Sequence, residues 1–96
     1  MSSLLPDLEK LLAISEAMLS AAGVADWEAL ASHEAERRAV ADQLPGLLNS
    51  GLSATAQERA RILIEACLRC DARIHPLVLA RQNELRVVLR EARPGA

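Results

Sequence analysis

Two cysteines and a histidine lie close together in the segment CLRCDARIHP, which covers residues 67–76. A Cys-x-x-Cys pair serves as a redox centre when its first thiol lies at a helix N-terminus, where free backbone N–H groups stabilise the thiolate. Cys67 and Cys70 fall instead inside a continuous apolar rhythm, and no strand is expected before them. The pattern therefore argues against redox chemistry.

Zinc is the second chemistry that this segment could support, because both cysteines, Asp71 and His75 share one side of a predicted helix. A structural zinc site needs a second pair of ligands, and the other histidine of the sequence, His33, falls on a different predicted helix. Reduced cysteines commonly act as small core hydrophobes. We therefore expect core packing for CLRC with no metal and no cofactor, and a zinc-binding regulator stays the weaker alternative.

Catalytic signatures are also missing from the sequence as a whole. It contains no Gly-rich phosphate loop, no Gly-x-Ser-x-Gly turn and no paired carboxylates that a rigid scaffold would hold together. Asp71 is expected to pair with Arg38 across the molecule or to remain solvated. The sequence therefore predicts a protein that is not an enzyme.

The composition predicts one helical domain. The chain has 96 residues, of which 51% are hydrophobic, yet Trp27 is the single aromatic side chain. Leucine, alanine, isoleucine and valine must fill the small core that a chain of this length can build.

The charge pattern limits the classes of partner. Residues 1–55 carry three basic and eight acidic side chains, and residues 56–96 carry eight basic and five acidic, so the halves have net charges of −5 and +3. This polarity is too weak for a nucleic-acid footprint. The start of the sequence lacks a basic leader, and the longest uncharged run, 43–57, is rich in loop residues, so we expect a cytoplasmic protein with no membrane span.

Glycine and proline divide the chain into three predicted helices, at about 4–22, 27–44 and 56–92, followed by a disordered tail at 93–96. Gly23 is expected to close the first helix in a left-handed conformation, and Asp26 to cap the second. The predicted architecture is an all-α, antiparallel three-helix bundle.

The third helix is predicted to begin with a capping box and to continue through a proline. In TAQE, at residues 55–58, Thr55 would cap the helix and Glu58 would reach back to the cap. The apolar pattern passes Pro76 without a phase break, so we predict a kink at that residue and not a loop.

The second helix has charged residues in the middle of its inward stripe. An ion pair between Glu34 and Arg38, four residues apart, is the simpler interpretation, and a polar contact with a partner is the alternative.

Helix length leads to a functional prediction. At 1.5 Å per residue, the first two helices each span about 27 Å, whereas residues 56–92 span about 55 Å. A hairpin of the first two helices covers only half of the third, and the uncovered apolar strip needs a partner. We expect the apolar side chains of this strip to lack an intramolecular cover and Arg81 to lie at the edge of the strip. The predicted partner-binding residues are Ile74, Leu77, Val78, Arg81, Leu85 and Val88.

The segments LLAISEAMLSAAGVADWEALASHEAERRAV and CDARIHPLVLARQNELRVVL, separated by a Pro/Gly loop, resemble the FliT-type flagellar export chaperones. The best local marks are the Asp26-Trp27 start of the second helix, Glu34 on that helix, and RQNEL at residues 81–85. The resemblance covers nearly the whole chain and depends on the order and spacing of these marks.

The resemblance implies a cytoplasmic type III export chaperone. Such a protein binds the C-terminal helical segment of the filament-cap protein FliD, prevents its premature assembly and aids its delivery to the export apparatus. It also implies contacts with the export ATPase and gate, repression of the flagellar master transcription regulator in some relatives, and a binding groove along the second and third helices. The alternative is a structural homodimeric helical adaptor without a secreted client, in which the strip packs against a second copy.

Overall fold

The computed structural model describes residues 4–44 and 51–92, and all regular structure in these ranges is helical. The helices are α1 (Leu4–Gly23), α2 (Trp27–Ala41) and α4 (Ala54–Glu91). The predicted all-α fold of three helices is confirmed. The loop expected around 45–50 and the tail expected at 93–96 lie outside the described residues.

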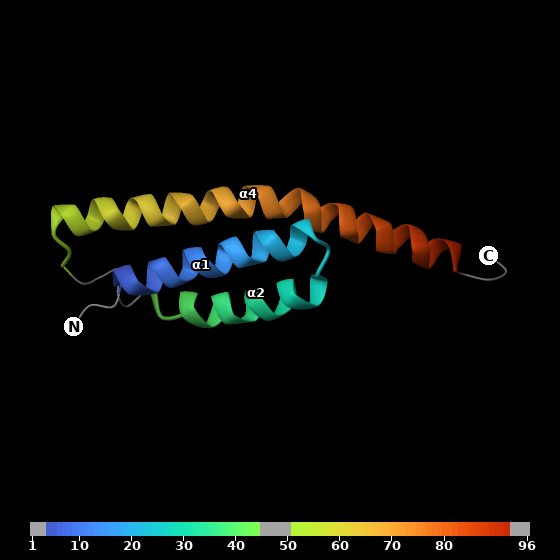
Figure 1. Ribbon diagram of the computed structural model, residues 1–96, viewed down its shortest axis with the longest axis horizontal. Coiled ribbons are helices and arrows are strands. Elements are labelled where there is room, and N and C mark those ends of the chain that lie inside the picture. Colours follow the sequence, from blue (N-terminus) through green and yellow to red (C-terminus); the bar gives the residue numbers. More distant parts are fainter. Residues whose placement is uncertain (1–3, 45–50, 93–96) are drawn as a thin grey trace.

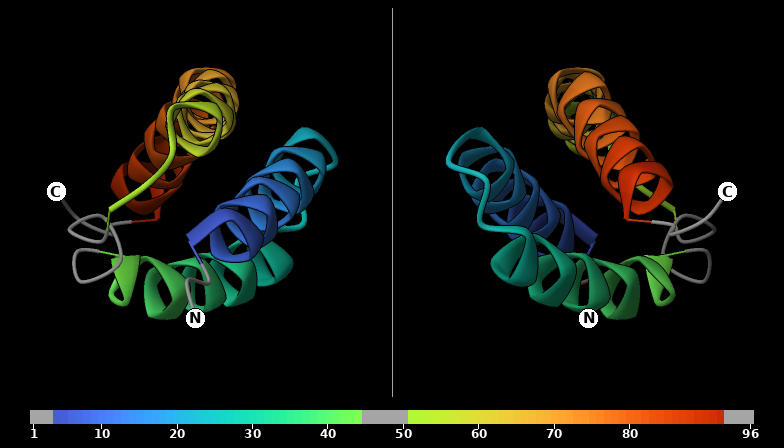
Figure 2. Two further views of the ribbon diagram at one scale, coloured as in Figure 1. Left: turned by 90° about the vertical axis from the view of Figure 1, so that its left-hand side faces the viewer. Right: turned by 90° about the vertical axis from the view of Figure 1, so that its right-hand side faces the viewer.

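Helix α1 lies between the other two helices and packs against both of them, whereas α2 and α4 do not pack directly on each other. Helix α2 runs antiparallel to α1, and α4 runs parallel to α1 (Figure 1). The end-on views in Figure 2 show α2 and α4 diverging from α1 on separate sides. This arrangement leaves a space between α2 and α4 with α1 at its base.

The core forms along the α1–α4 contact in two clusters. The first joins Leu4, Leu8 and Leu11 of α1 to Ala60 and Leu63 of α4. These residues recur every three or four positions, as expected for one face of a helix.

The second cluster joins Ile14 and Met18 of α1 to Ile74 of α4. Helix α2 contributes no buried residue to either cluster. It is attached instead through half-buried side chains, among them Leu30 and Val40, which pack against the clusters. Helices α1 and α4 therefore form the stable frame, and α2 is a more weakly attached wall.

The turn between α1 and α2 confirms one prediction and corrects another. The Asp26 side chain caps α2 by accepting a hydrogen bond from the Ala29 backbone N–H at 3.1 Å. The left-handed residue is Ala25, with φ of 60°, and not Gly23, which remains helical. Backbone N–H groups of Ala25 and Asp26 donate to the Ala22 and Ala21 carbonyls, respectively, a Schellman pattern whose left-handed residue lies two residues beyond the glycine.

The predicted capping box at the start of α4 is wrong. The cap is Ser53, whose hydroxyl accepts from the Ala56 N–H at 3.1 Å, and Thr55 lies inside the first turn. Glu58 does not reach back to the cap but pairs with Arg61, and this hydrogen bond and charge lower the pKa of the Glu58 carboxyl. Leu52 packs against the first core cluster, which places the next residue, Ser53, to cap the helix that begins at Ala54.

Helix α4 extends far past the α1–α2 hairpin. Its 38 residues correspond to about 57 Å, whereas the 20 residues of α1 correspond to about 30 Å. The helix continues through Pro76, and its axis changes direction near this residue in Figure 1, as expected where a proline removes an internal hydrogen bond. We call residues 82–91, which lie beyond the hairpin, the overhang.

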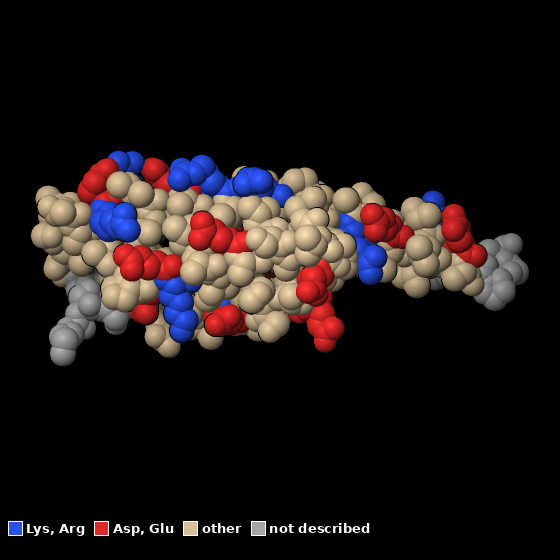
Figure 3. Space-filling view, viewed as in Figure 1, with Lys and Arg blue, Asp and Glu red and all other residues tan. Residues whose placement is uncertain are grey.

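The surface of the elongated molecule, 64 × 20 × 18 Å, carries both signs of charge. Acidic and basic side chains are interspersed on the face seen in Figure 3, with no large patch of one sign. Among residues 4–44 and 51–92, no helix is long and apolar enough to cross a bilayer.

Candidate functional site: a groove between α2 and α4

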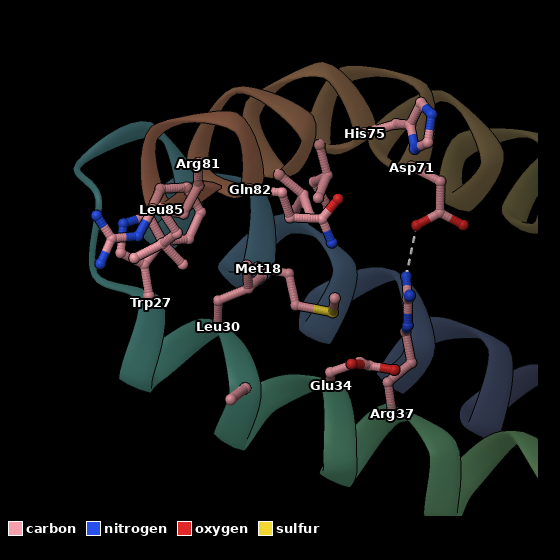
Figure 4. A pocket seen from close by; sticks show the side chains of 13 residues that line it. Met18, Trp27, Leu30, Glu34, Arg37, Asp71, His75, Arg81, Gln82 and Leu85 are labelled. Carbon is pink, nitrogen blue, oxygen red and sulfur yellow. Dashed lines mark hydrogen bonds and ion pairs between the residues drawn. The ribbon is translucent and has the colours of Figure 1, made fainter. Parts of the chain in front are cut away.

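The space between α2 and α4 contains an open groove of about 550 Å³. Figure 4 shows side chains from all three helices pointing toward it. We call it the α2–α4 groove. It is lined by Met18, Trp27, Leu30, Ala31, Glu34, Arg37, Asp71, Ile74, His75, Val78, Arg81, Gln82 and Leu85.

The base and the middle of the groove are apolar. Met18 and Ile74 are buried at the base, where α1 meets α4. Leu30 of α2 and Val78 of α4 pack against them from the two walls. The apolar lining continues to Leu85, which is exposed at the start of the overhang.

A polar bridge crosses the groove at one end. Arg37 of α2 donates from Nη1 to Asp71 Oδ1 of α4 at 2.6 Å and to the hydroxyl of Ser15 of α1 at 3.3 Å. Ser15 is fully buried, so this contact satisfies a polar group inside the core. The bridge links three helices and closes the groove at this end (Figure 4).

The partners expected for the charged residues are confirmed only in part. Glu34 pairs with Arg38 at 2.6 Å, as predicted. Asp71 pairs with Arg37 and not with Arg38, because Arg37 is the arginine that faces α4.

An aromatic contact marks the other end of the groove. The guanidinium of Arg81 lies over the ring of Trp27, 5.8 Å from its centroid. This distance is within the range of cation–π attraction. Trp27 begins α2 directly after the Asp26 cap, so the turn between the first two helices positions this side chain.

The predicted partner-binding residues fall into three groups. Ile74, Val78, Arg81 and Leu85 line the groove. Leu77 is half-buried but does not line it, and Val88 is exposed on the overhang.

Ile74 requires a correction. It was expected to lack an intramolecular cover, yet only 6% of it is exposed, because it packs against Ile14 and Met18. The hairpin reaches as far along α4 as Arg81, further than helix lengths alone indicated. Ile74 therefore forms part of the base of the groove and of the chain's own core.

The α2 side of the groove and the base from α1 include residues that sequence reasoning did not name. Met18, Leu30 and Arg37 line the groove but were not singled out from the sequence, and Trp27 was noted only as the single aromatic side chain and the start of a helix. The mixed charges in the α2 stripe were the signal that could have found them, because a stripe that is not fully apolar is not fully buried.

Core packing, predicted for CLRC, holds for the two cysteines but not for Leu68 between them, which is 60% exposed. Both cysteines are unpaired and half-buried, and each packs against one of the core clusters. Burial raises the pKa of both thiols, although a hydrogen bond involving Ser15 acts in the opposite direction on Cys67. Among the described residues, no group of three or more His, Cys, Asp or Glu side chains could hold a metal ion.

The overhang extends the apolar surface beyond the groove. Its large apolar side chains are exposed: Leu85, Val87, Val88 and Leu89. Leu85, Val88 and Leu89 recur at the three- and four-residue spacing at which helices pack together.

An open apolar groove, bounded by a salt bridge at one end and an Arg–Trp contact at the other and continued by an exposed helix face, is typical of helical protein-binding modules. The family model described as Flagellar protein FliT matches residues 5–96, nearly the whole chain. The chain therefore belongs to the FliT family, a family of flagellar chaperones. A comparison with curated proteins and another with solved structures gave no match.

Proposed function

We propose that this chain is a cytoplasmic type III export chaperone whose client is the C-terminal helical segment of the filament-cap protein FliD. The client helix lies in the α2–α4 groove and along the overhang. Binding there prevents premature assembly of FliD and aids its delivery to the export apparatus. Family membership supports the chaperone role. The choice of client is our inference.

One observation carries the proposal: the face of α4 that packs on α1 continues, without a change of phase, into surface that nothing covers in the described structure. Ile74 is buried on this face, Val78 is half-buried and Leu85 is exposed. An amphipathic helix with apolar residues at i, i+3, i+4 and i+7 can replace the missing cover beyond the hairpin.

The shape of the groove also fits a helix. Its walls are the helices α2 and α4 and its base is α1, so a bound helix would complete a four-helix arrangement. The polar bridge between Arg37 and Asp71 would limit how far the client extends toward the start of α4. At the other end, the overhang leaves the groove open.

Further contacts are proposed from family membership alone. They are the export ATPase and gate and, as in some relatives, the flagellar master transcription regulator. The groove would hold the client while other surfaces contact the export apparatus.

The test combines sedimentation and calorimetry with a peptide of the FliD C-terminal segment. Leu85→Asp places a charge in the groove and is expected to weaken binding by at least about 30-fold, since burying an unpaired charge is costly. Val87→Asp is the matched control, because Val87 is similarly exposed on the overhang but does not line the groove. It is expected to bind within about twofold of the parent chain.

The homodimeric adaptor predicts a different result. It would sediment as a dimer at all concentrations tested and would ignore the peptide. Leu85→Asp would then dissociate the dimer. A dimer that ignores the peptide, or a dimer that Leu85→Asp dissociates, would reject FliD as the client.

A further inference from the structure

The charged side chains of the α2–α4 groove differ in how closely they are neutralised within the chain. Glu34 has Arg38 at 2.6 Å, and Arg37 has Asp71 at 2.6 Å. At these distances the charges form short, charge-assisted hydrogen bonds. Neither pair needs a counter-charge from an occupant of the groove.

Arg81 differs from these pairs. Its ion-pair partner in the described structure is Glu84, three residues further along α4, at 3.7 Å and on the exposed side of the helix. The guanidinium also lies over the ring of Trp27, 5.8 Å from the ring centroid. A ring contact orients a guanidinium but leaves its N–H groups free to donate at the edges.

Filling the groove removes water from this guanidinium. An occupant that packs on Val78 and Leu85 covers the surface on both sides of Arg81, because the three residues share one stripe of α4 and all line the groove. A charge that loses its hydration without gaining a close partner opposes binding. A carboxylate on the occupant removes this cost and can accept two hydrogen bonds from one guanidinium.

We propose that Arg81 is a specificity-determining residue that pairs with a carboxylate of the bound helix. The α2–α4 groove therefore selects amphipathic helices whose apolar stripe is flanked by an acidic side chain. This inference rests on the part of the proposed function that places a helix in the groove, and it does not depend on FliD being the client.

The charge distribution of the chain decides how the inference is separated from general electrostatics. The formal net charge is −2, so long-range attraction favours a basic peptide over an acidic one. Residues 56–96 nevertheless carry a net charge of +3, so the test must separate Arg81 from the other arginines of α4.

The experiment uses two designed helical peptides that share one leucine stripe, flanked by Glu in the first and by Lys in the second. Calorimetry measures the dissociation constant of each with the full chain. We expect the Glu peptide to bind about tenfold more tightly, the effect of one charge-assisted contact. The preference should fall to within about twofold in Arg81→Gln and only in part in Arg81→Lys, which keeps the charge but loses the planar, two-donor guanidinium.

Arg86→Gln is the matched control, since Arg86 is an exposed arginine on the same helix that does not line the groove. It should leave the preference unchanged. The inference is overturned if the Lys peptide binds as tightly as the Glu peptide, if Arg86→Gln removes the preference as well, or if neither peptide binds. It is also overturned if the chain sediments as a dimer that neither peptide dissociates, because the groove is then filled by a second copy.

A parallel titration with the FliD peptide separates the two proposals. Failure of that peptide to bind, with the charge preference intact, rejects only the client. Binding of the FliD peptide with no effect of Arg81→Gln rejects only the role of Arg81.

Discussion

Replacing Ile74 with alanine tests the packing of α4 against the hairpin. Ile74 is only 6% exposed and packs against Ile14 and Met18. Truncating a buried isoleucine to alanine removes apolar contacts and leaves a cavity, which together cost about 2–4 kcal/mol. The free energy of unfolding of a domain of this size is about 5–10 kcal/mol, so the loss is a large part of it.

The matched variant is Val88→Ala on the overhang. Val88 is 58% exposed and belongs to neither core cluster, so its truncation should change the free energy of unfolding by less than about 0.5 kcal/mol. Urea denaturation followed by circular dichroism gives both values, and an unchanged m-value would show that the denatured state is the same. In thermal melts, Ile74→Ala should lower the midpoint by about 10–20 °C and Val88→Ala by a few degrees at most.

Equal losses for the two variants would refute the reasoning. Ile74 would then be no better covered than the overhang, and the hairpin would end earlier along α4 than the structure shows. The base of the groove would also have to be redrawn, since Ile74 forms it together with Met18.

Three other predictions concern the cap, the polar bridge and the thiols. Ser53→Ala should cost about 1 kcal/mol and Thr55→Ala less than about 0.5 kcal/mol in the same denaturation assay, because only Ser53 caps α4. Asp71→Asn should cost about 1 kcal/mol, and in a double-mutant cycle most of this loss should vanish in an Arg37→Met background, where the bridge is already absent. Burial raises the pKa of Cys67 in the folded chain, so the neutral thiol stabilises the fold below the unfolded pKa of about 8.5 and this contribution is lost as the pH rises through the folded value. A loss of stability above about pH 8.5 that is smaller in Cys67→Ala than in the parent chain would confirm it, since the raised pKa of Cys70 still contributes in that variant.

The sequence predicted the helices well because their ends carry strong local signals. Asp26 is a preferred cap, and the glycines and prolines other than Pro76 lie outside or at the ends of the apolar stripes. Even here, local preference did not decide everything. Ser53 and Thr55 are both acceptable caps, and the packing of Leu52 on the core, a tertiary contact, selects Ser53.

The site was predicted less completely, for reasons of geometry. Arg37 and Arg38 differ by about 100° around the helix axis, and only the packed structure shows which of them faces Asp71. The cover over Ile74 depends on the register between α1 and α4, which no local pattern encodes. Helix length predicted the existence of the uncovered strip but not the residue at which it begins.

Helix α2 is the element that buries no residue of its own, and this has a thermodynamic consequence. A helix bound in the α2–α4 groove would bury apolar side chains of α2 that the rest of the chain leaves only partly covered. Loading and the local ordering of α2 would then be linked equilibria, so that each stabilises the other by the same free energy. The bound helix would therefore act as an additional, dissociable part of the hydrophobic core. Its dissociation would weaken the packing of α2 but leave the packing of α1 against α4 unchanged.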